Sequence, residues 1–244
     1  MTLLPNYVDD SWKELLSDDF IEKLNVIEKT LDRMPLHDCG YAYFPKKDKI
    51  MRFLSLDLQN IKCIILGMEP YPSWYTNEDG KIEGVATGRS FEVKNVKSWQ
   101  QKFKQASLIN ILKAIVFNET GQKKTIAEIR NDIDNGDFQM SEPPEWFDKR
   151  EQSGVLFLNA TLTVEPDHPD SHTQLWEEVM NDVMKYIDKK NKNVKWLLFG
   201  KNAKQRVIFT IGENDNQYHC CHPRLPKFVD ENIFKNIEEI KWNL

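Results

Sequence analysis

The sequence has no long apolar run and no excess of basic residues. Its apolar runs are only four to six residues long, too short for a membrane-spanning helix. Lys and Arg number 33 against 38 Asp and Glu, which gives a net charge of −5. Any nucleic-acid partner would therefore have to bind a local basic patch rather than a generally basic surface. Residues 1–10 lack the features of a secretory signal.

Cysteine is also scarce. The four cysteines, Cys39, Cys63, Cys220 and Cys221, have neither the spacing of a metal site nor a repeated pairing pattern. The adjacent pair is typical of strand residues. We therefore expect a reduced, cytoplasmic protein without a structural metal.

What the sequence does contain is a strand that ends abruptly in a stiff loop. The apolar, partly β-branched run Ile61–Leu66 predicts a buried strand, which Gly67 and two following prolines bring to an end. The loop carries one carboxylate, Glu69, and one aromatic ring, Tyr71. Open α/β sheets place their chemistry at such carboxyl ends of strands, although a turn with a solvated Glu is the plain alternative.

Three further strands are predicted, and each ends at a residue that stands out: Val155–Leu158 at Asn159, Val194–Phe199 at Gly200, and Gln217–Cys221 at His222. Helical patterns lie before, between and after these strands. The first predicted helix is capped by Ser11 and Glu14 and ends at Met34. Further helices are predicted over Ile50–Leu58, from Ser107 onward, over Glu145–Arg150, over Leu175–Ile187, from Lys201 onward and over Asp230–Ile240. We expect a polar insertion with a turn at Asn77–Gly80, and an irregular surface excursion over Lys123–Pro144.

The alternation of short strands with crossovers predicts an α/β protein. We expect a three-layer α/β/α arrangement whose central, mainly parallel sheet has four strands, formed by residues 1–244 as a single domain. The carboxyl ends of parallel strands lie along one edge, so Glu69, Asn159 and His222 would meet there. A carboxylate, an amide and an imidazole, with Phe91 or Tyr71 to stack on a planar ligand, suit the departure of a flat heterocycle from a sugar. Taken singly, Asn159, Phe91 and His222 fit a structural role better than a functional one, and only their joint order favours the functional role.

Several segments, in order, resemble the uracil-DNA glycosylases, most closely the first family. Gly67-Met68-Glu69-Pro70-Tyr71-Pro72 is similar to the family's water-activating loop Gly-Gln-Asp-Pro-Tyr-His. The segment from Ala86 to Phe91 is similar to the one that ends in the base-stacking phenylalanine. The strand ending at Asn159 resembles the one carrying the uracil-reading Asn, and His222-Pro223-Arg224-Leu225-Pro226 resembles His-Pro-Ser-Pro-Leu. The resemblance covers nearly the whole chain.

The resemblance implies a glycosylase that flips uracil out of DNA, hydrolyses its N-glycosidic bond without metal or organic cofactor and so initiates base-excision repair. Glu69 would support the sugar cation and the attacking water, and His222 would stabilise the negative charge on the departing base. The substrate-binding residues would be Met68, Tyr71, Phe91 and Asn159. The DNA contacts would be Ser107, Lys201, Arg224 and, as the wedge, Leu225.

The implied partner is uracil-containing DNA, single- or double-stranded. A proteinaceous glycosylase inhibitor or a replication protein is a further candidate, and we expect a monomer without a membrane partner.

The loop departs from the family pattern where it matters most. Glu69 stands in place of Asp, Met68 in place of Gln, Pro72 in place of His, and Arg224 in place of Ser in the wedge loop. A carboxylate displaced by about 1 Å is enough to reduce a rate roughly a hundredfold. Two alternatives therefore stay open: a glycosylase-like protein that binds uracil-containing or modified DNA, or a replication partner, with weak or no turnover, and an active glycosylase for a different base.

Overall fold

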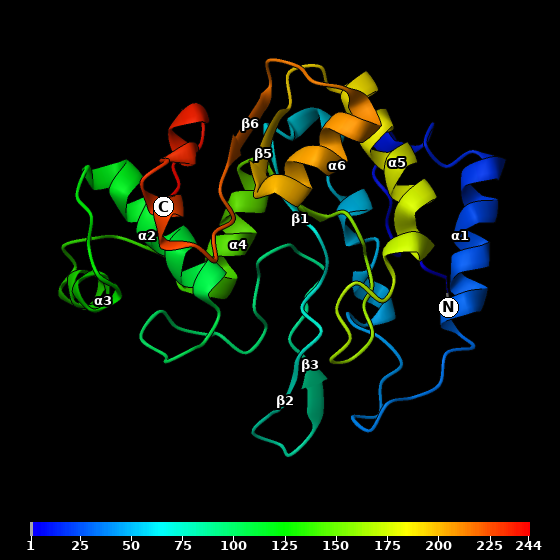
Figure 1. The fold of residues 1–244 in the computed structure, drawn as a ribbon, viewed down its shortest axis with the longest axis horizontal. Helices are drawn as coiled ribbons and strands as arrows, with labels where there is room; N and C mark the ends of the chain where they lie inside the picture. The colour runs from blue at the N-terminus through cyan, green and yellow to red at the C-terminus, as the bar shows by residue number, and fades with distance from the viewer. Residues whose placement is uncertain (1) are drawn as a thin grey trace.

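A four-stranded sheet occupies the centre of the computed structural model, which describes residues 2–244. The spatial order of the strands is β4 (Val155–Asn159), β1 (Cys63–Gly67), β5 (Lys195–Phe199) and β6 (Gln217–Cys220). Every neighbouring pair is parallel. Each strand reaches the next through a crossover, as Figure 1 shows, so the four carboxyl ends lie at one edge.

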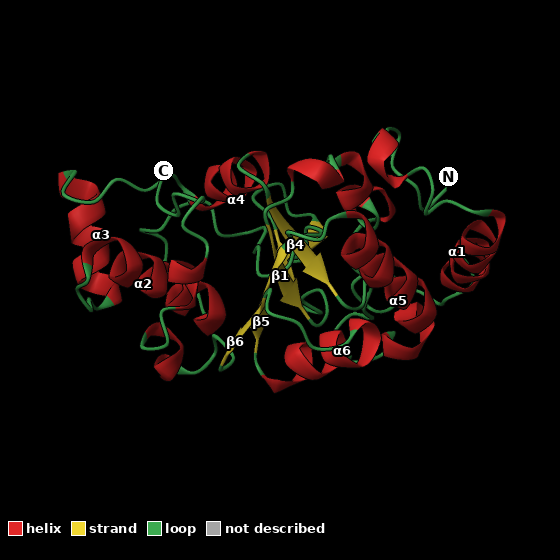
Figure 2. Cartoon of the chain, turned by 90° about the horizontal axis from the view of Figure 1, so that it is seen from above, coloured by secondary structure: helices red, strands yellow, loops and turns green. Residues whose placement is uncertain are grey.

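Side chains of β1 alternate between two hydrophobic cores. Ile64 and Leu66 point into one core, and Cys63 and Ile65 into the other. The first core is closed by α1 (Asp18–Leu31), α5 (Thr173–Lys190) and α6 (Lys201–Ile211), and the second by α2 (Ala106–Thr120), α3 (Ile126–Asn135) and α4 (Pro143–Gln152). Figure 2 shows the strands between these two groups of helices. The predicted three-layer α/β/α fold with a parallel four-stranded sheet is confirmed.

The predicted first helix begins later than expected. Ser11 lies in a short 3-10 turn, Asp10–Trp12, because its hydroxyl donates to Asp9 and accepts from the backbone of Leu58. The helix itself starts after Ser17, whose side chain accepts from the Phe20 N–H. The prediction of a helix over Ile50–Leu58 is also wrong. Two 3-10 turns, Arg52–Ser55 and Leu58–Asn60, replace it, and a further 3-10 turn, Lys47–Lys49, precedes them.

The segment Lys123–Pro144, predicted to be irregular, contains α3. The Thr125 side chain accepts from the Glu128 N–H while the Glu128 side chain accepts from the Thr125 N–H, so a capping box begins this helix. Gly136, with a left-handed backbone, ends it. The prediction of an irregular segment was wrong because the capping box lies among many charged residues and was not recognised. The helical turn predicted at Glu145–Arg150 is the middle of the longer α4.

The last predicted helix, Asp230–Ile240, is wrong as well. Two 3-10 turns, Pro226–Val229 and Ile233–Asn236, occupy this region, because Asn232 adopts a left-handed conformation that a continuous helix cannot contain. The helix predicted to start at Ser107 does form, but it begins at Ala106 after Gln105, which makes no side-chain capping bond.

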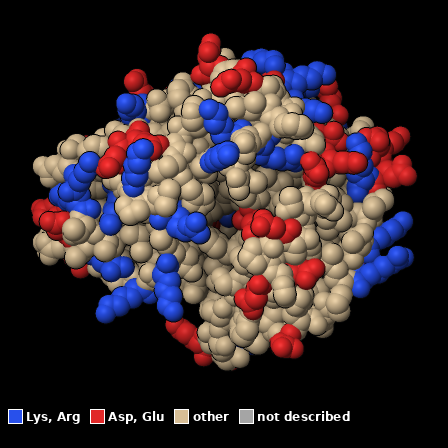
Figure 3. All heavy atoms as spheres, in the orientation of Figure 1, with Lys and Arg blue, Asp and Glu red and all other residues tan. Residues whose placement is uncertain are grey.

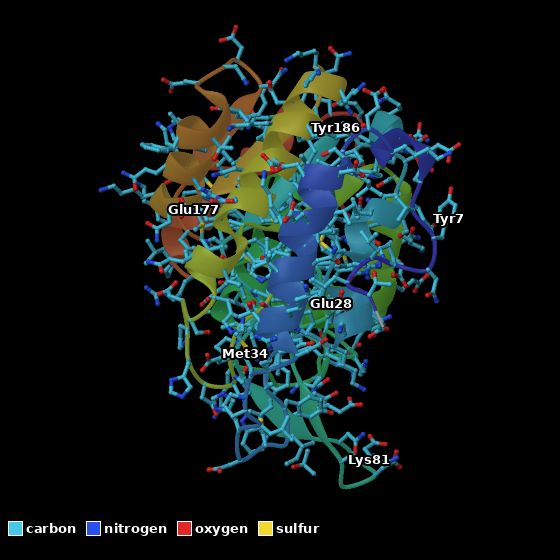
Figure 4. All side chains as sticks on the ribbon, turned by 90° about the vertical axis from the view of Figure 1, so that its right-hand side faces the viewer. Tyr7, Glu28, Met34, Lys81, Glu177 and Tyr186 are labelled. Carbon is cyan, nitrogen blue, oxygen red and sulfur yellow. The ribbon has the colours of Figure 1, made fainter. Side chains whose placement is uncertain are left out.

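The polar insertion is an antiparallel hairpin made of β2 (Trp74–Thr76) and β3 (Ile82–Gly84). The turn predicted at Asn77–Gly80 is confirmed, since Asn77 Oδ1 accepts from the backbone N–H groups of Asp79 and Lys81. Figure 4 shows Lys81 near the tip of this hairpin, which projects from the body of the protein.

Over residues 2–244, every helix is too short or too polar to cross a bilayer. The same residues contain no group of three or more His, Cys, Asp or Glu side chains arranged to hold a metal ion.

The two inner strands, β1 and β5, should account for much of the stability. Leu198 on β5 is fully buried in the core that α1, α5 and α6 close, whereas Phe209 on α6 is 93% exposed. Leu198→Ala should lower the free energy of unfolding by about 2–5 kcal/mol, because it removes buried methyl groups and leaves a cavity. Phe209→Ala, the control, should change it by less than about 0.5 kcal/mol. Urea unfolding measures both, and equal losses would contradict the assignment of the core.

Candidate active site

A cavity of about 550 Å³ opens at the carboxyl edge of the sheet. Its walls come from the ends of β1, β4 and β5, the loop after β6, and the first turns of α2 and α6. Nine of the ten predicted site residues line it: Met68, Glu69, Tyr71, Phe91, Ser107, Asn159, Lys201, His222 and Arg224. Residues nearly 160 positions apart in sequence therefore share one cavity.

The floor of the cavity depends on the pairing of β1 with β4. Gly67 is directly opposite Asn159 in this parallel ladder, and the Gly67 carbonyl accepts from the Ala160 N–H at 2.9 Å. A Cβ atom on residue 67 would collide with the Asn159 amide oxygen and lie 2.8 Å from Ser90 Cβ. Glycine is required here by the close approach of the two side chains rather than by backbone conformation.

Asn159 is the buried polar group of this floor. Its side chain is 2% exposed, and its Oδ1 atom has no hydrogen-bond partner among the described residues. A buried, unpaired amide oxygen costs about 1–3 kcal/mol, and a ligand in the cavity that donates a hydrogen bond to it would remove that cost.

Phe91 forms an aromatic wall in a strained backbone conformation. Its φ of 63° is in the left-handed region, which bulky residues rarely adopt. The preceding Ser90 donates its hydroxyl to the Ile65 carbonyl of β1 at 2.8 Å, which ties the segment to the sheet. The Phe91 ring lies 5.4 Å from Phe199 and 6.4 Å from His222, measured between ring centroids. A planar ligand beside Phe91 would thus also be near the imidazole.

His222 follows β6 and lies next to Gly200 at the end of β5. The Arg224 backbone N–H donates to His222 Nδ1 at 3.1 Å, so Nδ1 carries no proton and the neutral ring holds its proton on Nε2. Burial lowers the pKa of His222, and the nearby Arg224 charge lowers it further. The ring is therefore a neutral hydrogen-bond donor at neutral pH.

Glu69 is half-buried in the loop after β1. Its Oε2 atom accepts from the Asp170 backbone N–H at 2.7 Å. Burial raises the pKa of this carboxyl, and the Asp170 N–H partly opposes that rise. The loop is also held at Met68, whose carbonyl accepts from the Thr161 N–H at 2.9 Å. Burial likewise raises the pKa of Tyr71, so its phenol stays protonated.

Cationic side chains and helix amino termini line part of the cavity. Lys201 and Asn202 begin α6, and Ser107 lies in the first turn of α2, so the amino-terminal ends of two helices contribute to the wall together with Arg224. Helix amino termini and cationic side chains both favour anions. The space-filling view in Figure 3 shows a hollow near the middle of the face turned toward the viewer, with Lys and Arg on one side of it and Asp and Glu on the other.

Leu225 is the predicted residue that does not line the cavity. It is 48% exposed on the loop that carries His222, and its N–H donates to the His222 carbonyl at 2.9 Å. Sequence reasoning missed Phe199 and Asn202, which also line the cavity, and the backbone contact from Asp170. Phe199 at the end of a predicted strand and Asn202 at the start of a predicted helix could have been identified as cavity residues from those positions.

Known proteins of similar sequence indicate the family of this chain. No protein-family model matches the chain. The uracil-DNA glycosylase of Fusobacterium nucleatum is 26% identical over 262 aligned residues, which cover 97% of this chain and 96% of the relative. The uracil-DNA glycosylase of Borreliella burgdorferi is 31% identical over 202 residues, which cover 82% of this chain and 76% of the relative.

The chain belongs to the uracil-DNA glycosylase family. Solved structures support the same fold for this glycosylase. The UNG structure from Nitratifractor salsuginis has a TM-score of 0.70 at 19% identity, covering 96% of this chain and 92% of that one. Mimivirus uracil-DNA glycosylase has a TM-score of 0.62 at 18% identity, covering 91% and 70%.

The protonation state of His222 in this glycosylase is open to direct measurement. Because burial and Arg224 both disfavour the imidazolium, NMR titration should give His222 a pKa below the ordinary 6.5, with the proton on Nε2 above that pKa. Arg224→Ala should raise the pKa, since it removes the charge but keeps the backbone donor. A His222 pKa above 6.5, or an Nδ1–H tautomer, would contradict the geometry.

Proposed function

We propose that this glycosylase flips uracil out of DNA and hydrolyses its N-glycosidic bond, the first step of base-excision repair. Family membership supports the activity, since the relatives are named uracil-DNA glycosylases. The observation that carries the proposal is the buried, unpaired Oδ1 of Asn159 in a cavity that Phe91 also lines. An amide offers both an acceptor and donors, which is what the edge of a uracil base requires.

Recognition of the base would depend on three groups. Asn159 would hydrogen-bond the base edge, and Phe91 would stack on its face. Tyr71, which lies in the stiff loop after β1, would occupy the space that the 5-methyl group of thymine needs. Met68, the fourth substrate-binding residue, would present an apolar surface where a polar side chain stands in the family pattern.

The chemistry requires charge stabilisation on both sides of the breaking bond. As the C1′–N1 bond breaks, its electron pair leaves with the base and the sugar becomes cation-like. The neutral His222 would donate from Nε2 to a uracil carbonyl oxygen and so stabilise the departing anion. Glu69, ionised, would stabilise the sugar cation and orient the water whose oxygen adds to C1′. The proton of that water passes to solvent or to the base.

DNA would bind across the basic side of the cavity. Lys201 and Arg224, with Ser107 and the helix ends, would contact phosphates and set the position of the strand without reading its sequence. Leu225, exposed on the His222 loop, would act as the wedge that fills the gap left by the flipped base.

Finer assignments follow from the same proposal. The loop Gly67–Pro72 would be a divergent form of the first-family water-activating loop, with Glu69 in the role of Asp. We also propose that the chain acts as a cytoplasmic monomer and a single domain. A proteinaceous inhibitor or a replication protein is a candidate partner, and a mimivirus UNG variant has been solved in complex with UGI.

One observation keeps a second function in view. Glu69 Oε2 is already engaged by Asp170, and the longer side chain differs from the family pattern. A protein that binds uracil-containing or modified DNA, or a replication partner, with weak or no turnover would fit this feature, as would an active enzyme for another base.

The test is incubation of a uracil-containing oligonucleotide with the protein, followed by alkali and analysis of strand cleavage. The wild type should cleave the uracil strand and leave a thymine strand intact. Asn159→Ala and His222→Ala should each lower the rate at least roughly a hundredfold, because each removes a donor or acceptor aimed at the base. Asn118→Ala and His219→Ala, matched changes outside the cavity, should leave it unchanged.

The outcomes separate the alternatives. Absence of product from single- and double-stranded uracil substrates would overturn the proposal. Tight uracil-dependent binding without product would then identify a binding protein. Release of another base from a panel of lesions would identify an enzyme of different specificity. Unchanged rates in both cavity variants would show that the residue roles are wrong.

A further inference from the structure

The loop between β4 and α5 holds two aspartates in an unusual backbone conformation. Asp167 has a φ of 59° and Asp170 a φ of 63°, both in the left-handed region that residues other than glycine rarely adopt. Strained backbone of this kind persists only where the surrounding structure fixes it, and it is concentrated at functional sites.

Both aspartates direct backbone N–H groups at the loop that carries Glu69. The Asp167 N–H donates to the Pro72 carbonyl at 3.0 Å, and the Asp170 N–H donates to Glu69 Oε2 at 2.7 Å. The Asp167 side chain adds a third link, since its Oδ2 accepts from Trp74 Nε1 at 3.0 Å. The β4–α5 loop therefore holds both the end of the Glu69 loop and the carboxylate itself.

We propose that Asp170 is a positioning residue for Glu69. Its backbone N–H, aimed by the left-handed conformation, fixes one carboxylate oxygen, so that the other, Oε1, is presented to the sugar and to the attacking water. This inference rests on the proposed function, because it gives Glu69 a catalytic task. No protein hydrogen bond to Oε1 is found within residues 2–244, which leaves that oxygen available.

The hydrogen bond between the Asp170 N–H and Glu69 Oε2 requires a side chain as long as that of Glu. Glu has one more rotatable bond than Asp, and an unanchored Glu would therefore place its carboxylate less reproducibly than a reacting group needs. An Asp at position 69 would fall short of the Asp170 N–H by about 1.5 Å, the length of one C–C bond. Glu69 and Asp170 thus form a matched pair, and a shorter carboxylate would lose the anchor rather than restore a better geometry.

The electrostatic surroundings of Glu69 make the anchor measurable. Burial raises the pKa of Glu69, the Asp170 N–H lowers it, and the Asp170 carboxylate raises it. The other titratable or charged groups that share the cavity are Tyr71 on the same loop, Lys201 on α6, and His222 and Arg224 after β6. Loss of the N–H contact removes the lowering effect, so the carboxyl would protonate at a higher pH than in the wild type.

The experiment compares two substitutions at Asp170. Asp170→Val keeps the N–H but disfavours the left-handed conformation, whereas Asp170→Gly, the conservative variant, adopts it freely. Asp170→Val should lower kcat on a uracil oligonucleotide roughly tenfold or more, with KM changed less than about twofold, since a hydrogen bond to a charged group is lost. The acid limb of its pH–rate profile should lie at higher pH than that of Asp170→Gly, because both variants lack the Asp170 carboxylate and only Asp170→Val loses the N–H contact. Asp170→Gly keeps the N–H and loses only the Asp170 carboxylate, which raises the pKa of Glu69, so its kcat should stay close to that of the wild type and its acid limb should lie at the same or a slightly lower pH.

Two further variants complete the design. Glu69→Asp should lower kcat despite restoring the residue of the family pattern. Asn232→Val imposes the same kind of strain at another left-handed residue, Asn232 with a φ of 39°, outside the cavity. It should lower stability without moving the pH–rate profile, which separates strain in general from loss of the anchor.

The results that overturn this inference are distinct from those that overturn the function. If the wild type is active and Asp170→Val shares the kcat and pH profile of Asp170→Gly, or if Glu69→Asp is faster than the wild type, Asp170 does not position Glu69. If the wild type releases no uracil, the proposed function fails. The anchor is then judged by NMR titration of Glu69, whose pKa should be higher in Asp170→Val than in Asp170→Gly, and equal values would refute it.

Discussion

The in-register parallel pairing of β1 with β4 is the constraint on which the rest of the structure depends. It places Gly67 opposite Asn159, and the absence of a side chain at residue 67 lets the Asn159 amide lie across the strand end. The Ala160 N–H then donates to the Gly67 carbonyl and the Thr161 N–H to the Met68 carbonyl, so the loops that follow β1 and β4 stay paired beyond the strand ends. Glu69 and the Asn159 amide are therefore positioned by one backbone ladder rather than by two independent loops.

The site combines groups that would each be unfavourable elsewhere in a core. An unpaired buried amide oxygen, a carboxyl with a raised pKa and an imidazole with a lowered pKa all result from partial burial at the sheet edge. The two hydrophobic cores on either side of the sheet offset these costs. A cavity made of such groups is prepared for a neutral, planar ligand whose departure develops charge, and its basic side suits the phosphates that accompany that ligand.

The sequence was most informative where periodicity and strand-ending residues coincide. Buried parallel strands are continuous apolar runs, so the strands, the sheet edge and Glu69, Asn159 and His222 could be predicted without coordinates. The backbone conformation of the site loops could not be predicted, because nothing in the sequence around Asp170 indicates a left-handed φ or the contact with Glu69. The charged segment around α3 and the 3-10 turns near the carboxyl terminus were missed because capping and a single residue such as Asn232 decided their structure locally.

The central claim is that one cavity holds the base against Phe91 and Asn159 while Glu69 faces the sugar. A crystal structure with an oligonucleotide containing a non-hydrolysable deoxyuridine analogue tests it most directly. The account predicts a flipped uracil stacked on Phe91, its edge hydrogen-bonded to the Asn159 amide, a carbonyl oxygen within reach of His222 Nε2, and the Glu69 carboxylate on the open face of C1′. A base bound outside this cavity, or a Glu69 carboxylate directed away from C1′, would contradict it.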